Sequence, residues 1–180
     1  MYRQVRYAAN VAGVGFDAAV IERLQDMRNK GCKGKSSYLR ALVRTFFKYK
    51  PTGVKIWVDG RLMYNNLLLS MAIGVGKYNG GGIQQLPAAV ADDGLLDLTI
   101  IRPLHWWNII FRLKRLFNGN IYTIGHVLHA KGRNIRIESS PEIQLEVDGE
   151  LYGHSPIEVR NVHRDVRVIV NCSFLKRIKQ

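Results

Sequence analysis

Two short acidic patterns in the sequence could do chemistry. Val147-Asp148-Gly149-Glu150 places two carboxylates one glycine apart, and Val90-Ala91-Asp92-Asp93-Gly94-Leu95 is an acidic bend broken by glycine. A positioned carboxylate can accept the proton of an alcohol during phosphoryl transfer, where positioning dominates because the transition state is loose. One carboxylate and two loop carbonyls are a sufficient protein contribution to a magnesium site, because the ion keeps several waters. Glu150 is therefore our candidate base, and the bend is our candidate metal loop.

Both patterns also have a simpler interpretation. Asp148 could fill a turn position of a hairpin while Glu150 is solvated, and Asp93-Gly94 could be a plain turn between strands. The sequence leaves both alternatives open.

A run of three glycines, Gly80-Gly81-Gly82, follows Lys77. Glycine reaches left-handed backbone conformations at little cost, so such a run can bring the backbone close to a ligand. The segment matches neither standard phosphate loop, because the dinucleotide fingerprint lacks its third glycine and Lys77 is not followed by Ser or Thr. We expect these glycines to lie against substrate or a neighbouring domain.

These patterns occur in an order that resembles the C-terminal domain of the soluble diacylglycerol kinase and sphingosine kinase family of lipid kinases. The resemblance covers nearly all of the chain. It rests on the following segments: Asn10-Val11-Ala12-Gly13-Val14-Gly15-Phe16-Asp17-Ala18, Gly80-Gly81-Gly82, Pro87-Ala88-Ala89, Asp93-Gly94-Leu95-Leu96-Asp97 and Asp148-Gly149-Glu150.

The resemblance implies roles for the acidic patterns. Glu150 matches the family's proton acceptor, and Asp148 matches its neighbour in the site. The side chain of Asp93 and the carbonyls of Val90 and Leu95 match the ligands of a structural magnesium ion. That ion is distinct from the magnesium that travels with ATP, the co-substrate of the family.

Two further assignments follow from the resemblance. Asp17 matches an acid that touches the lipid head group in the sphingosine kinase branch, although it could instead cap a helix. Lys33 and Lys35 stand where bacterial relatives place a basic residue near the phosphates, although they could be solvated charges.

The family's nucleotide-binding domain carries a Gly-Gly-Asp-Gly-Thr loop, and this sequence has none. We therefore expect residues 1–180 to be a single substrate-binding and base-bearing domain that is inactive without a nucleotide-binding partner domain. The alternative is a non-catalytic domain that binds anionic lipid or a protein partner. The identity of the lipid and the formation of a homodimer stay open.

Charge and hydropathy limit the classes of partner that we expect. The formal net charge is +13, with 47% apolar residues, so anionic partners are favoured. No nucleic-acid reader motif is present, so we rank nucleic acid last. The longest uncharged apolar stretch is too short to cross a bilayer, and we expect a cytoplasmic protein in peripheral contact with anionic membrane. The apolar and basic segment Leu104–Phe117 could lie at that membrane or pack in the core.

The periodicity of the chain predicts an α+β fold, with an antiparallel β-sandwich core and a few flanking helices. Helices are expected over 17–27, 36–48 and 103–117. Strands are expected over 2–14, 54–58, 62–73, 95–101, 134–138, 143–147, 156–159 and 165–170.

Overall fold

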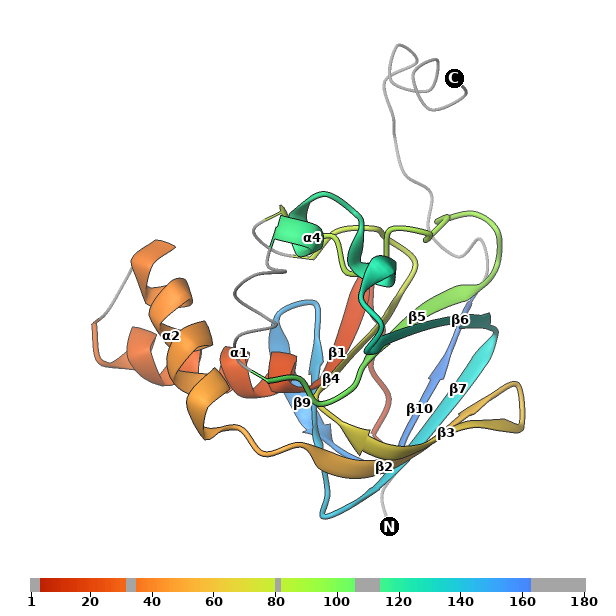
Figure 1. Ribbon diagram of the computed structural model, residues 1–180. Coiled ribbons are helices and arrows are strands. Elements are labelled where there is room, and N and C mark those ends of the chain that lie inside the picture. Colours follow the sequence, from red (N-terminus) through yellow and green to blue (C-terminus); the bar gives the residue numbers. More distant parts are fainter. Residues whose placement is uncertain (1–3, 32–34, 80–81, 106–113, 163–180) are drawn as a thin grey trace.

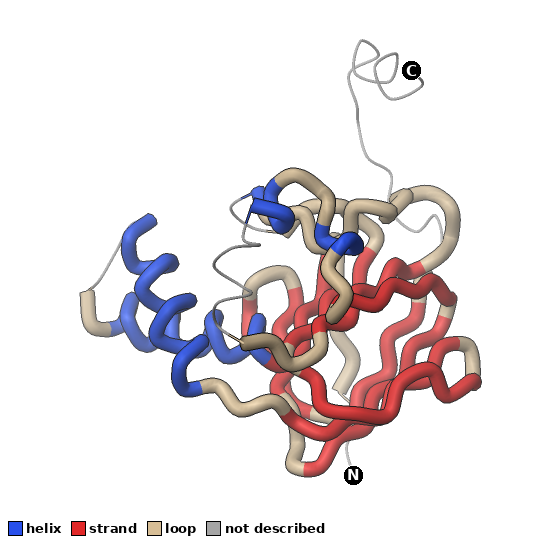
Figure 2. The backbone as a smooth tube through the Cα atoms, viewed as in Figure 1, coloured by secondary structure: helices blue, strands red, loops and turns tan. Residues whose placement is uncertain are grey.

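The structure is a computed structural model that describes residues 4–31, 35–79, 82–105 and 114–162. In this part of the chain, antiparallel strands form two layers, and a helical hairpin lies at one side of them (Figures 1 and 2). The α+β sandwich prediction is confirmed.

The larger sheet has six strands in the order β6-β5-β4-β1-β8-β9, and the smaller has four in the order β10-β7-β2-β3, among the described residues. The larger sheet consists of β1 (Val11–Gly15), β4 (Ser70–Gly74), β5 (Leu96–Ile101), β6 (Val127–Gly132), β8 (Gln144–Val147) and β9 (Glu150–His154). The smaller sheet consists of β2 (Thr52–Val58), β3 (Arg61–Leu68), β7 (Asn134–Ser140) and β10 (Ile157–Arg160). The helices are α1 (Phe16–Asn29), α2 (Lys35–Lys48), α4 (Lys114–Phe117) and the 3-10 turn η2 (Ile121–Thr123).

The core lies between the sheets and follows the two-residue period of the strands. Successive side chains of a strand point to opposite faces, so every second residue reaches the core. Ile56 of β2 and Ile137 of β7 pack in one cluster with Met71 of β4 and Leu98 of β5, and all four are buried. The apolar alternation of the sequence thus becomes the sandwich interior.

The opposite face of the larger sheet carries buried polar residues. Ser70 of β4, Asp97 and Thr99 of β5 and Glu146 of β8 are all buried although they alternate with core residues. Helix α1 contacts β1, β4, β8 and β9, and Leu86 and Ala89 pack on Val11 and Ala72 at this face. A second covering layer therefore encloses polar side chains that a two-layer sandwich would leave in water.

Several predicted elements differ in the structure. The expected strand 62–73 is two strands in different sheets, because the chain crosses at Leu69, whose N–H donates to the Ile101 carbonyl of the larger sheet. The first strand begins only at Val11, and β6 was not predicted as a separate strand. The helix expected from Pro103 is wrong at its start, because residues 103–105 are not helical. Residues 106–113 and the expected strand 165–170 lie outside the described residues.

Candidate functional site

Two carboxylates from distant parts of the sequence converge over Gly13 of β1. A Cβ atom added at Gly13 would lie 2.5 Å from Glu146 Oε1 and 3.0 Å from the Cβ of Asp17. Glycine at this position therefore leaves the space in which the Glu146 side chain crosses β1 toward α1. Both acids lie on the covered polar face of the larger sheet.

Asp17 is oriented by a short chain of amides. The Gln85 Nε2 group donates to Asp17 Oδ2 at 2.9 Å, and Asn79 Nδ2 donates to Gln85 Oε1. Burial raises the pKa of the Asp17 carboxyl, and the Gln85 hydrogen bond partly offsets this effect. The alternative role of Asp17 as a helix cap is wrong, because α1 begins after Gly15 without any side-chain cap.

Glu146 is held in the same environment. The residue is 5% exposed, and the Gly149 N–H donates to Glu146 Oε2 at 2.8 Å. Burial raises its pKa to about 7, the Gly149 hydrogen bond lowers it, and the charges of Asp17 and Asp148 raise it further. A carboxyl with this pKa can both accept and hold a proton near neutral pH.

Both carboxyls line the polar end of a cavity of about 510 Å³. Ser70 Oγ and Asn79 Oδ1 also line the cavity. Ser70 hydrogen bonds the Asp17 carboxyl and lowers its pKa, whereas Asn79 Oδ1 is buried without a hydrogen-bond partner among the described residues. The rest of the wall is largely apolar and includes Phe16, Val20, Ile21, Phe46, Leu116 and Ile121. An apolar cavity that ends in unsatisfied polar groups fits an amphiphile whose head carries hydrogen-bonding groups.

The predicted catalytic pair lies at the turn between β8 and β9. Asp148 has a φ of 49°, and its carboxylate accepts backbone N–H groups of Ala9 (2.6 Å), Asn10 (3.1 Å) and Val11 (3.0 Å). Asp148 thus fills a turn and anchors the segment before β1, and it also lines the cavity. Its role beside a base stays a prediction.

Glu150 lies outside the cavity lining, at the start of β9. Its side chain is 65% exposed and pairs with the Arg6 guanidinium, whose side chain is 35% exposed. A base must be free to accept a proton, so Arg6 would have to release or share this carboxylate. The prediction for Glu150 is therefore untested, whereas Asp17, Glu146 and Asp148 all line the cavity.

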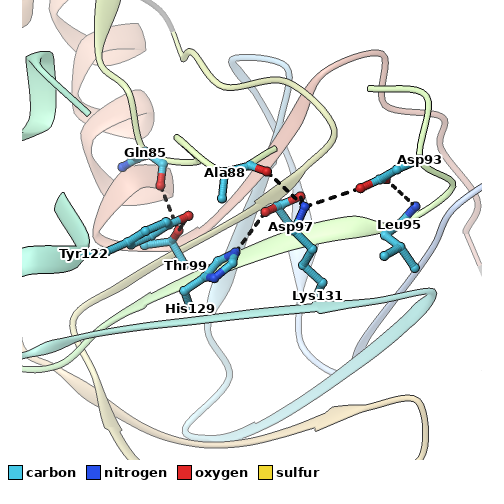
Figure 3. Close-up of polar contacts among 9 residues, drawn as sticks. All are labelled: Gln85, Ala88, Asp93, Leu95, Asp97, Thr99, Tyr122, His129 and Lys131. Carbon is cyan, nitrogen blue, oxygen red and sulfur yellow. Dashed lines mark hydrogen bonds and ion pairs between the residues drawn. The ribbon is translucent and has the colours of Figure 1, made fainter. Parts of the chain in front are cut away.

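The Asp93 bend contains a lysine ammonium (Figure 3). Lys131 Nζ lies 2.9 Å from the Ala88 carbonyl oxygen, 3.3 Å from Asp93 Oδ2 and 3.0 Å from Asp97 Oδ2. The other Asp93 oxygen accepts the Leu95 N–H at 2.9 Å. Burial disfavours the ammonium, but Asp97 and then Asp93 outweigh this effect and raise the pKa of Lys131.

The predicted metal loop is therefore internally satisfied at Asp93. The Val90 carbonyl accepts the Asp93 N–H at 3.4 Å, so this ligand candidate is also engaged within the bend. No three His, Cys, Asp or Glu side chains gather into a metal-binding group in the described part of the chain. The Asp93 carboxylate does not fit a magnesium ion while Lys131 is paired with it, and the assignment of Val90 and Leu95 stays a prediction.

A polar network connects this bend to the cavity (Figure 3). Asp97 Oδ1 lies 2.9 Å from His129 Nε2, and the His129 ring stacks on Tyr122 with centroids 4.5 Å apart. The Tyr122 hydroxyl lies 3.3 Å from Thr99 Oγ1, which donates to the Gln85 carbonyl at 2.8 Å. Gln85 is the residue that orients Asp17, so the two acidic regions share one support.

The remaining predicted residues are only partly described. Gly82 has a φ of 81° and open space around it, and the Asn79 N–H donates to the Ile83 carbonyl across the glycine run at 2.8 Å. Asn79 and Ile83 line the cavity. Gly80, Gly81 and Lys33 lie outside the described residues, as does the side chain of Lys35 at the start of α2. Their roles stay predictions.

Sequence reasoning missed Glu146 and Gln85. Glu146 stands between Leu145 and Val147, so the two-residue period places it on the face away from the core. From the sequence alone, this face is expected to be exposed to solvent. The signal that could have found it is its position two residues before the Asp148-Gly149-Glu150 motif, on the strand that enters that turn.

Comparison with known proteins places the chain in a family. Residues 10–170 match the family described as the YegS C-terminal NAD kinase beta sandwich-like domain, and the chain belongs to this family. The resemblance to the C-terminal domain of diacylglycerol-kinase-like lipid kinases is thereby confirmed.

Two relatives illustrate the match. A diacylglycerol kinase of Bacillus subtilis (strain 168) is 26% identical over 168 residues, which are 92% of this chain and 54% of that protein. A crystal structure of a diacylglycerol kinase from Bacillus anthracis (strain Sterne) aligns with a TM-score of 0.58 at 26% identity, over 86% of this chain and 49% of that one. The chain spans about half the length of the relatives it matches.

Proposed function

We propose that this chain holds the lipid acceptor in an ATP-dependent lipid kinase, which transfers a phosphoryl group to a lipid hydroxyl such as that of diacylglycerol. The observation that carries the proposal is the apolar cavity that ends in Asp17 and Glu146. The family supports it, because the Bacillus subtilis relative is named a diacylglycerol kinase. ATP and its magnesium ion would be bound by a separate nucleotide-binding domain.

The apolar and polar parts of the cavity would bind different parts of the lipid. The apolar side chains of α1 and α2 would bind acyl chains, because burying this surface is favourable. The head-group hydroxyl would donate to Asp17 or Glu146, and a second head-group donor could bind Asn79 Oδ1, which has no partner among the described residues. The reacting oxygen is then held where a carboxyl can receive its proton.

Two carboxylates are candidates for the base. Glu150 is indicated by the family motif, and Glu146 by its place in the cavity and its pKa of about 7. In a chain that includes the nucleotide-binding domain, replacing the base with Gln should lower kcat by about 100-fold or more. Parallel kcat measurements on Glu150→Gln and Glu146→Gln identify it, and Glu138→Gln, at an exposed ion pair, is the control. If neither variant loses kcat, neither carboxylate is the base.

A second candidate function is a domain that binds anionic lipid or a protein partner without catalysing transfer. The net charge of +13 favours an anionic lipid. The chain by itself should then bind anionic lipid but show no ATP hydrolysis. ATP turnover by the purified chain would contradict this candidate.

Peripheral membrane contact remains part of the proposal. The net charge of +13 favours an anionic lipid surface. Among the described helices, none is long and apolar enough to cross a bilayer. Co-sedimentation with vesicles of phosphatidylcholine, with and without phosphatidylglycerol, measures this contact, and equal binding to both would contradict an electrostatic contribution.

A further inference from the structure

We infer that the Lys131 ammonium takes the place of a divalent cation at the Asp93 bend, so that this chain stiffens the bend without a metal ion. The inference concerns how the chain builds its own site, and it does not depend on which lipid the cavity binds.

The oxygen atoms around Lys131 form a cation site. Three oxygens lie within 3.3 Å of Nζ, and they come from the Ala88 carbonyl, Asp93 at the bend and Asp97 on β5. The ammonium donates hydrogen bonds to the Ala88 carbonyl and to Asp93, and it forms an ion pair with Asp97. These are the carboxylate and carbonyl oxygens that a hard cation also prefers.

The strand register delivers Lys131 to this position. β5 and β6 pair antiparallel with Asp97 opposite Lys131, so both side chains lie on the same face of the sheet. Figure 3 shows the Lys131 side chain reaching from β6 across to the carboxylates of Asp97 and Asp93. The pairing of β5 with β6 therefore fixes the position of the ammonium beside Asp97.

Burial explains why a cation is required here. The Asp97 side chain has no exposed surface, and a buried carboxylate is costly unless it is paired and hydrogen bonded. Lys131 supplies one positive charge and His129 contacts the other Asp97 oxygen at 2.9 Å. A magnesium ion in the same cage would lie beside the ammonium, and the two like charges would repel each other.

Lys131 also acts indirectly on the cavity. Lys131, on β6, donates to the Ala88 carbonyl. Ala88 lies three residues after Gln85, which hydrogen bonds Asp17. Lys131 is thus a positioning residue for the segment that forms one wall of the cavity. The lysine performs the stiffening that the metal loop was expected to perform.

Metal titration of the unmodified chain tests the inference directly. Adding MgCl2 to 10 mM, or EDTA, should change Tm by less than about 1 °C relative to NaCl of equal ionic strength, because no net ligand binding stabilises the fold. A saturable rise of Tm with Mg²⁺ that disappears in Asp93→Asn would overturn the inference, whether or not any lysine variant folds.

The variant Lys131→Met supplies the second arm. Removing Lys131 leaves the buried Asp97 carboxylate without its cation, which should lower Tm by about 6 °C or more. Mg²⁺ should then restore part of the loss in a saturable way, and Asp93→Asn in the same background should abolish that response. An unchanged Tm in Lys131→Met, or no response of this variant to Mg²⁺, contradicts the inference. If Lys131 only contributed packing, Mg²⁺ would not raise the Tm of Lys131→Met. A saturable rise of Tm with Mg²⁺ in this variant is therefore specific to the inference.

Discussion

Two acidic regions lie on the same face of the larger sheet, and they differ in how their charge is compensated. At the bend, Asp93 and Asp97 surround the Lys131 ammonium. At the cavity, Asp17 and Glu146 approach each other, and no Lys, Arg or His is among the described residues that line it. Carboxylates with their own cation stabilise the fold, whereas burial without a cation raises the pKa of the cavity carboxyls and leaves them able to receive a ligand.

The largest effect should come from breaking the compensated region. Asp97→Asn removes the buried carboxylate that contacts both Lys131 and His129, so the free energy of unfolding should fall by about 2 kcal/mol. Urea unfolding followed by circular dichroism measures this change.

An exposed ion pair provides the matched control for this experiment. The side chains of Arg136 and Glu138 are 62% and 39% exposed, so Glu138→Gln should change stability by no more than about 1 kcal/mol. If Asp97→Asn and Glu138→Gln cost the same, the difference between a buried and a surface pair does not hold here.

The second effect concerns the apolar wall of the cavity. Ile21→Trp places a larger side chain where acyl chains would lie, so the affinity for dioctanoylglycerol should fall about tenfold or more, roughly 1.4 kcal/mol. Isothermal titration calorimetry measures the affinity. Leu62→Trp is the control, because Leu62 is exposed on β3 and does not line the cavity. Equal losses of affinity in both variants would show that the lipid does not bind in the cavity.

The smallest effect is the pH dependence of the uncompensated region. The pKa of Glu146 is raised from 4.5 to about 7, so the folded state binds its proton more tightly than the unfolded chain does. The stabilisation is complete below pH 4.5 and is lost as the pH rises through about 7.

Glu146→Gln removes this titration. Its free energy of unfolding should therefore change less than that of the unmodified chain between pH 4.5 and pH 8. Urea unfolding at several pH values measures both curves. Parallel curves would show that Glu146 does not carry the dependence.

The sequence predicted the sandwich because its strands keep a two-residue apolar period, as Val54, Ile56 and Val58 show. It did not predict the change of sheet at Leu69, because the stretch from Leu67 to Ile73 is apolar almost throughout and reads as one long strand. A covering layer on the outer face buries residues that periodicity assigns to solvent.

The candidate site was predictable only in part. Asp17 and the Asp93 bend could be found because they stand in short motifs. The pairing of Asp17 with Glu146 could not, because 129 positions separate them and only the alignment of β1 with β8 brings them together. Lys131 is hidden for the same reason, since its role depends on the register of β6 against Asp97.

Amide chemical-shift mapping with dioctanoylglycerol tests the central claim most directly. If the cavity between α1 and the larger sheet binds the lipid, saturable shifts should appear at Gly13, Ser70 and Ile121, and they should weaken in Asp17→Asn. Shifts confined to the β2–β3 hairpin, or none at saturating lipid, would contradict the account.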